Sequence, residues 1–260
     1  MRLDTRDPST VARLALRCLD LTSLNEGDTE VDVALLCERA RHCAGPVAAV
    51  CVWPRLASFA RRRLESSIAV AAVANFPAGE SPLPAVLGEV REIVAAGAQE
   101  IDVVLPWRSL QSGDEAAVRK LLGAVREASA GRTLKVILET GELRETEPIA
   151  RAARLALDCD ADFLKTSTGK SRVGATPAAA EVMLQAILAH PRARDRAGLK
   201  VAGGLRRVTD VVPYVELCAR HLGASALSPR RLRFGASALL DDVVAVLAGT
   251  DPPASSHGRY

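Results

Sequence analysis

Short apolar runs alternate with longer amphipathic stretches along almost the whole chain. The apolar runs are typical of strands buried on both faces, and the stretches between them repeat apolar residues every three or four positions, as helices do. The pattern predicts strands at residues 19–21, 47–52, 68–75, 101–105, 134–139, 163–166 and 199–202, and a weak eighth strand at 224–227. Helices are predicted at 31–41, 83–96, 115–130, 148–157, 177–189 and 208–220.

Two of these helices begin with recognisable capping residues. Thr176 places a hydroxyl before Pro177, and proline is favoured at the first helical position. Asp114, at the end of a Ser-Gly-Asp turn, offers a carboxylate to the helix that follows. These signals predict where each helix begins relative to the strand before it.

The alternation of strands and helices predicts an α/β fold class, as a single-domain (β/α)8 TIM barrel. A chain of 260 residues is close to the usual size of one such barrel. An open doubly wound sheet is disfavoured, because no G-x-G-x-x-G turn follows the first strand. The barrel, with an N-terminal helix, is predicted over residues 1–249, and the polar, Pro/Ser-rich residues 250–260 are expected to form a flexible tail.

Charge and composition exclude several classes of partner. The net charge is only +3, the basic residues are dispersed, and aromatic residues make up 3% of the chain, so nucleic-acid binding is not expected. No apolar run approaches the roughly 18 residues that would span a bilayer, and the first residues lack a signal-peptide core, so no membrane association is expected. A small anionic substrate needs no more than a local positive field.

Cysteine and histidine usage argue against disulfides and metals. The six cysteines form no C-x-x-C pair and are scattered among apolar segments, which is typical of reduced thiols in a cytoplasmic protein. The four histidines are dispersed, and none follows a predicted strand, so we expect no metal site and no catalytic triad.

Lys165 and Lys200 stand in neighbouring predicted strands, where lysine is rare. Lys165 ends an apolar strand and Lys200 lies within the next one, so both are predicted to point into one barrel mouth. A structural alternative is that Lys165 only extends its ammonium out of the barrel end. A P-loop reading of Gly169-Lys170 fails, because Leu164 stands where that motif requires glycine.

An amine must be uncharged to attack a carbonyl. An ordinary lysine, with a pKa of about 10.4, is uncharged in only about one molecule in 2,500 at pH 7. Lowering the pKa to about 7 requires roughly 4.6 kcal/mol of destabilisation of the ammonium, which burial and a neighbouring cation can supply. The lysine pair therefore suggests Schiff-base chemistry.

Other polar residues interrupt the predicted strands. Asp102 is a carboxylate in an apolar run and a candidate proton carrier, although a salt bridge within the barrel is an equal alternative. Asp20 and Lys135 are interpreted as substrate contacts or as members of the same ionic network. Cys51, at the end of the second strand, faces either the pocket or the core.

Glycine-rich turns are predicted after the last three strands. They comprise Thr168-Gly169-Lys170, Gly203-Gly204 and the segment 234–237, which contains Gly235 and Ser237. Glycine allows a ligand to approach the backbone closely, and barrels often hold phosphate in this quadrant. The three turns together predict an anion site.

Five motifs, in matching order, resemble deoxyribose-phosphate aldolases from about residue 16 to the C-terminus. They are LDLTSLN at 19–25, EIDVVLP at 100–106, KVILETGEL at 135–143, FLKTSTGK at 163–170 and RFGAS at 233–237. The resemblance implies a cofactor-free class I aldolase that reversibly cleaves 2-deoxy-D-ribose 5-phosphate to D-glyceraldehyde 3-phosphate and acetaldehyde.

The resemblance also implies roles for individual residues. Lys165 matches the Schiff-base lysine, Lys200 the lysine that perturbs it, Asp102 the carboxylate of the proton relay, and Tyr260 a C-terminal tyrosine implicated in proton transfer. The remaining matches are substrate contacts: Asp20, Cys51 and Lys135 in the polar part of the site, and Thr168, Gly169, Lys170, Gly203, Gly204, Gly235 and Ser237 around the phosphate.

Two positions depart from the family pattern: Val201 replaces a frequent proline, and Ala238 replaces a frequent second serine, which removes one possible phosphate ligand. Two alternatives are a related Schiff-base aldolase acting on another phosphorylated sugar and a non-catalytic sugar-phosphate binding protein. Apolar excess on helix faces makes a homodimer plausible.

Overall fold

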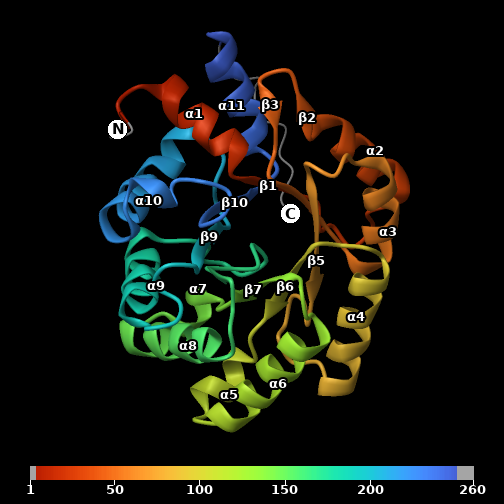
Figure 1. The fold of residues 1–260 in the computed structure, drawn as a ribbon, viewed down its shortest axis with the longest axis vertical. Helices are drawn as coiled ribbons and strands as arrows, with labels where there is room; N and C mark the ends of the chain where they lie inside the picture. The colour runs from red at the N-terminus through yellow and green to blue at the C-terminus, as the bar shows by residue number, and fades with distance from the viewer. Residues whose placement is uncertain (1–3, 251–260) are drawn as a thin grey trace.

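Eight parallel strands close into a barrel in the computed structural model, which describes residues 4–250 (Figure 1). The order around the barrel is β1-β10-β9-β8-β7-β6-β5-β4, and β4 pairs with β1 to close it. The (β/α)8 TIM barrel predicted from the sequence is therefore confirmed. The barrel strands are β1 (Leu19–Thr22), β4 (Ala49–Val52), β5 (Ala69–Ala74), β6 (Glu100–Val104), β7 (Thr133–Ile137), β8 (Phe163–Lys165), β9 (Gly198–Ala202) and β10 (Leu232–Ala236).

Helices form an outer ring around the strands (Figure 1). They are α1 (Pro8–Arg17), α2 (Glu30–Arg39), α3 (Pro54–Arg63), α4 (Leu83–Ala95), α5 (Trp107–Gln111), α6 (Glu115–Ala128), α7 (Thr140–Leu143), α8 (Thr146–Asp158), α9 (Pro177–Ala189), α10 (Val208–Leu222) and α11 (Leu239–Ala248). A short antiparallel pair, β2 (Arg41–His42) and β3 (Gly45–Pro46), follows α2 and was not predicted. None of the helices described between residues 4 and 250 has the length and apolarity needed to cross a membrane.

Both predicted helix caps are confirmed. The Thr176 side chain accepts a hydrogen bond from the Ala179 N–H, and α9 begins at Pro177. The Asp114 carboxylate accepts one from the Ala117 N–H at the start of α6. Each cap satisfies a backbone donor that has no partner within its helix, so it anchors the helix start beside the barrel rim.

The predicted eighth strand was wrong. Residues 224–227 do not form a strand; the 3-10 turn η1 (Ala224–Ala226) lies there, after Gly223 turns the chain with a φ of 83°. The eighth strand is β10, where Arg233 interrupts the apolar pattern and hides it from a hydrophobicity analysis. Gly235 consequently lies inside β10, and the interpretation of 234–237 as a turn was also wrong.

The two faces of the strands have different environments. Val50 and Val52 in β4 belong to the main apolar core, whereas Cys51 between them packs with Leu24 and Val73 in a separate, smaller cluster. Side chains alternate between faces along a strand, so the first set faces the helices and the second faces the barrel interior. Charged residues of other strands are buried close to this apolar cluster.

Candidate active site

Seven charged side chains from six strands form one connected ionic network inside the barrel. Every member forms an ion pair of 2.5–3.3 Å with at least one other member, and all are buried. The members are Asp20 (β1), Glu100 and Asp102 (β6), Lys135 (β7), Lys165 (β8), Lys200 (β9) and Arg233 (β10).

Asp102 joins the three lysines. Its Oδ1 accepts a hydrogen bond from Lys135 Nζ at 2.7 Å, and its Oδ2 accepts from Lys165 Nζ at 2.8 Å and from Lys200 Nζ at 2.6 Å. The strand register explains the convergence, because Asp102 is aligned with Lys135, and Lys165 is aligned with Lys200. The two lysines predicted to meet therefore share one carboxylate oxygen.

Arg233 anchors the other end of the network. Its guanidinium donates to Asp20 Oδ1 at 2.6 Å and to Glu100 Oε1 at 2.7 Å. Lys135 Nζ lies 2.6 Å from Glu100 Oε2, so this carboxylate connects Arg233 to the lysine layer. The barrel interior is thus held together by charge pairing instead of by apolar packing at this depth.

The network shifts the pKa values of its members in different directions. Burial opposes the ionisation of Asp102, but Lys135, Lys165 and Lys200 hold its pKa well below the usual range. Burial also opposes the charge of Lys200, yet Asp102 and Asp20 raise the pKa of its ammonium. Lys135 has a raised pKa for the same reasons. These groups remain charged at neutral pH.

Lys165 behaves differently from its neighbours. Burial lowers the pKa of its ammonium, Asp102 opposes this shift, and Lys200 adds to it, so that the net change is downward. Among residues 4–250, Lys165 has one carboxylate partner, whereas Lys200 has two and Lys135 has three. The network contains four basic groups and three carboxylates, so it becomes electrically neutral when Lys165 gives up its proton. The amine best suited to nucleophilic attack is therefore Lys165.

A narrow space of about 10 Å³ lies over Lys165. Four of its seven lining residues, Thr168, Gly169, Gly203 and Gly235, are predicted phosphate contacts, and the lining is completed by Thr22, Lys165 and Ala202. A Cβ at Gly235 would lie 3.2 Å from Lys200 Cε, so glycine keeps this space open. The structure brings these predicted residues together around the amine.

Other predicted residues lie nearby but not in this lining. Lys170 and Ser237 are half-buried at loop positions, and Gly204 is exposed beside Gly203. Cys51 is fully buried, and burial raises the pKa of its thiol, with Asp102 adding to the effect, so Cys51 stays protonated. Tyr260 lies outside the described residues.

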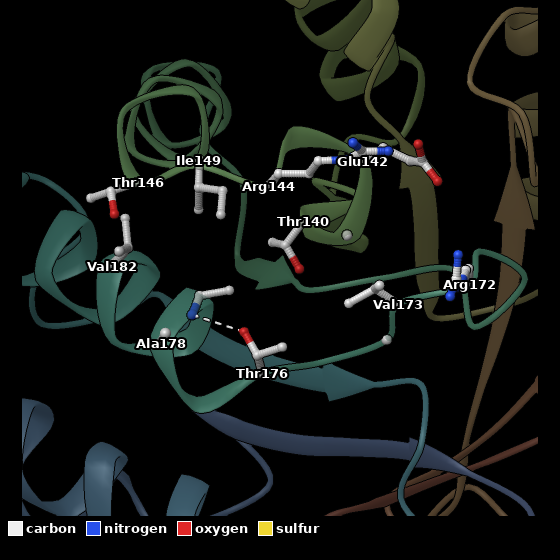
Figure 2. A pocket seen from close by; sticks show the side chains of 13 residues that line it. Thr140, Glu142, Arg144, Thr146, Ile149, Arg172, Val173, Thr176, Ala178 and Val182 are labelled. Atoms are coloured by element: carbon white, nitrogen blue, oxygen red, sulfur yellow. Dashed lines mark hydrogen bonds between the residues drawn. The ribbon is translucent and has the colours of Figure 1, made fainter.

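A wider cleft, of about 500 Å³, lies between α7, α8 and α9 (Figure 2). Its charged side chains, Glu142, Arg144 and Arg172, are exposed or half-exposed, and none belongs to the barrel network. The narrow space over Lys165 is smaller than this cleft, but it contains the buried amine and is the candidate active site. Across residues 4–250 no group of three or more His, Cys, Asp or Glu side chains is placed to hold a metal ion.

Sequence reasoning did not assign roles to Glu100, Arg233 and Glu139. Glu100 and Asp102 are two residues apart in one strand, a spacing that puts both carboxylates on one face and could have revealed the first. Arg233 was obscured by the misplaced eighth strand. Glu139 follows β7 with a left-handed φ of 55°, a conformation that the sequence gives no sign of.

The fold and the lysine cluster have the features of an aldolase that forms imines with its substrate. The chain belongs to the DeoC/LacD family of aldolases, whose model matches residues 14–243. A relative from Agrobacterium fabrum (strain C58 / ATCC 33970), described as deoxyribose-phosphate aldolase, is 42% identical over 99% of this chain and 100% of its own length. The resemblance found in the motifs is therefore confirmed.

Solved structures agree with this assignment. A crystal structure from Toxoplasma gondii ME49, provisionally described as a deoxyribose-phosphate aldolase, has a TM-score of 0.85 at 26% identity and covers 96% of this chain and 98% of its own. A tetrameric deoxyribose phosphate aldolase from Aeropyrum pernix has a TM-score of 0.68 at 27% identity, with coverage of 94% and 97%. The likeness extends over almost the whole of each chain.

Proposed function

We propose that this protein is a class I aldolase that reversibly cleaves 2-deoxy-D-ribose 5-phosphate to D-glyceraldehyde 3-phosphate and acetaldehyde through an imine on Lys165. The observation that carries the proposal is the buried Lys165 amine, with a lowered pKa, 2.8 Å from Asp102 and beside Lys200. The family membership and the Agrobacterium relative support the lyase activity and the sugar phosphate as substrate.

Imine formation begins with attack of neutral Lys165 on the C1 aldehyde. The ionised Asp102 carboxylate is placed to carry the proton that the nitrogen loses to the carbonyl oxygen, which gives a carbinolamine. Loss of the carbinolamine hydroxyl as water takes up one further proton from solvent and leaves the positive iminium. Lys200 stays charged beside both groups and favours the neutral form of the attacking amine. This division of roles accounts for two lysines with opposite pKa shifts.

Bond cleavage follows from the positive iminium nitrogen. The C3 hydroxyl gives its proton to solvent water, the C2–C3 electron pair moves toward the iminium to form an enamine, and glyceraldehyde 3-phosphate departs as the new C3 aldehyde. Protonation of the enamine at C2 and attack of water on the iminium then release acetaldehyde and the free Lys165 amine. By resemblance, Tyr260 is the group proposed to exchange the proton at C2.

The glycine turns are proposed to hold the phosphate. Gly169, Gly203 and Gly204 have φ values of 81°, 93° and 91°, and their N–H groups donate to no acceptor within residues 4–250. Unpaired backbone N–H groups in such turns form concave sites for anions. Thr168, Lys170, Gly235 and Ser237 are proposed to complete this phosphate site, and Asp20, Cys51 and Lys135 to support the sugar end.

Borohydride reduction in the presence of acetaldehyde tests the proposal. The imine should be trapped as an ethyl group on Lys165 and located by peptide mass spectrometry, while Lys165→Met should show no adduct. Exposed Lys120 serves as the matched position, since Lys120→Met should leave trapping unchanged. Adduct formation without cleavage of 2-deoxyribose 5-phosphate, but with cleavage of another phosphorylated sugar, would indicate a related aldolase. Tight sugar-phosphate binding with neither adduct nor turnover would indicate a binding protein.

We also infer a cytoplasmic location and a homodimer. The cysteines of the described chain are free thiols, four of them buried, in keeping with a reducing compartment. Val31 and Leu35 lie one turn apart on α2 and expose 70% and 56% of their surface, which gives a second copy an apolar face to cover. Light scattering of the wild type and of Val31→Glu tests the dimer, since the variant should reduce the measured mass if this face is the interface.

A further inference from the structure

Glu139 is a buried carboxylate that the barrel network does not use. It lies two residues beyond β7, is only 3% exposed, and its backbone takes the left-handed conformation, with φ 55° and ψ 58°. Residues with a Cβ rarely adopt this conformation, and such strain persists where surrounding contacts enforce it. The contacts of Glu139 are therefore informative about function.

Within the described chain, all the hydrogen-bond partners of the Glu139 side chain lie in one loop. The carboxylate accepts the Thr168 hydroxyl at 2.5 Å, the Thr168 N–H at 3.2 Å and the Ser171 hydroxyl at 3.0 Å. Because the Thr168 hydroxyl donates to Glu139, its lone pairs are free to accept the Lys170 N–H, which it does at 3.0 Å. Glu139 therefore fixes Thr168 directly and Lys170 through Thr168.

Close backbone packing holds the same loop on both sides. A Cβ at Gly141 would clash with the Val173 carbonyl, and a Cβ at Gly174 would clash with the Gly203 carbonyl. The Ala175 N–H also donates to the Gly203 carbonyl at 3.1 Å. The loop is thus fitted between the turn after β7 and the Gly203 turn, with Val173 facing the cleft of Figure 2.

The inner side of this loop is the proposed phosphate site. Gly169 stands between Thr168 and Lys170, and the Glu139 contacts leave its N–H without an acceptor in the described part of the chain. A carboxylate in this loop would repel a bound phosphate unless hydrogen-bond donors compensated the charge of the carboxylate. Three loop donors supply that compensation, so Glu139 can shape the loop without facing the ligand as an open charge.

We propose that Glu139 is a positioning residue that holds the 168–171 loop in its phosphate-binding shape and so determines the preference for a phosphorylated sugar over the same sugar without phosphate. The inference rests on the proposed function, because it names how that site selects its substrate. Glu139 is not proposed to take part in bond cleavage. Burial raises the pKa of Glu139, against the opposing effect of the Thr168 hydrogen bonds, in keeping with a carboxylate shielded from solvent.

The test compares 2-deoxyribose 5-phosphate with 2-deoxyribose for wild type, Glu139→Ala, Glu139→Gln and Ser171→Ala. Glu139→Ala should raise KM for the phosphorylated sugar about tenfold, the order expected for loss of one charge-assisted hydrogen bond, and leave kcat/KM for the unphosphorylated sugar within about twofold. Glu139→Gln keeps an acceptor for the Thr168 N–H and should recover part of the loss. Ser171→Ala should give a smaller change in the same direction.

A matched control and a binding measurement complete the design. Glu142→Ala removes a neighbouring half-buried carboxylate whose side chain has no hydrogen-bond partner among the described residues. This variant should leave KM and kcat/KM unchanged for both sugars. Inorganic phosphate, used as the probe in calorimetry, should bind about tenfold more weakly to Glu139→Ala than to wild type.

The possible outcomes separate this inference from the proposed function. Equal losses for both sugars, or no loss with either, would overturn the positioning role. If wild type cleaved neither sugar and formed no borohydride adduct, the proposed function would fail, but phosphate calorimetry would still decide the role of Glu139. If Glu139→Ala did not fold, Ser171→Ala and Glu139→Gln would provide the same comparison.

Discussion

Lys165 and Lys200 are aligned on adjacent strands and bind the same oxygen of Asp102, yet their pKa values move in opposite directions. The difference comes from their remaining partners. Lys200 also pairs with Asp20 at 2.5 Å, whereas Lys165 has no second carboxylate among the described residues. Two identical side chains on adjacent strands therefore suit the two different roles proposed for them, one as nucleophile and one as fixed charge.

The first prediction concerns pH. Lys165 is reactive only when deprotonated, so kcat/KM should rise with pH through its lowered pKa and level off above it. The acid limb should consequently lie below the value of about 10.4 of an ordinary lysine. Initial rates measured from pH 5 to pH 10 check this, and a rate that climbs only near pH 10 would contradict the proposed nucleophile.

The second prediction concerns the charge beside the nucleophile. Lys200→Met removes a cation next to Lys165 and leaves Asp102 more available to stabilise its ammonium, so the acid limb should move up by about one pH unit and kcat/KM at pH 7 should fall about tenfold or more. The measurement is the same pH profile. Lys120→Met, on the exposed face of α6, is the control and should leave the profile in place.

The third prediction concerns stability. Asp102→Asn leaves three buried amino groups, two of them permanently charged, without their shared partner and should lower the free energy of unfolding by about 3–5 kcal/mol. Urea unfolding at pH 7 measures it, with exposed Asp195→Asn as the control. A change of less than about 1 kcal/mol would show that the network does not depend on Asp102.

Acid should reduce the difference in unfolding free energy between wild type and Asp102→Asn. The folded-state pKa of Asp102 lies below its unfolded value, so its contribution to stability is present above the ordinary aspartate range and is lost as pH falls toward the folded-state value. The gap between wild type and Asp102→Asn should therefore narrow when unfolding is measured at progressively lower pH, starting below about pH 4. A gap that stayed constant would conflict with the depressed pKa.

The fourth prediction concerns space at the site. Gly235→Ala places a Cβ 3.1 Å from Ala202 Cβ and 3.2 Å from Lys200 Cε, so either Lys200 or the strand must shift. We expect kcat/KM to fall about tenfold, with a stability loss of about 1–3 kcal/mol from overpacking. Gly123→Ala in α6, where nothing lies within 4 Å, should leave activity unchanged and stabilise the helix slightly. Full activity of Gly235→Ala would show that the cleft tolerates the methyl group.

The sequence could indicate those members of the candidate site that interrupt an apolar run. It could not indicate those that depend on tertiary contacts. Lys165, Lys200 and Asp102 stand out because charge is costly in a buried strand. The same cost concealed β10, because Arg233 makes a true strand look polar although Asp20 and Glu100 neutralise its charge. Glu139 was missed because its left-handed backbone and its loop partners exist only once the barrel has closed.

The ionic interior has a consequence for how such a protein can change. Each charge of the network is balanced by groups from other strands, so a single replacement there leaves a neighbour uncompensated, and new sequences must arise by paired substitutions across the barrel. The loops above contain fewer buried charges, so most of their residues can be replaced without leaving an unpaired charge in the interior. Altered substrate range should therefore be sought in the rim, with the charged interior inherited as one unit.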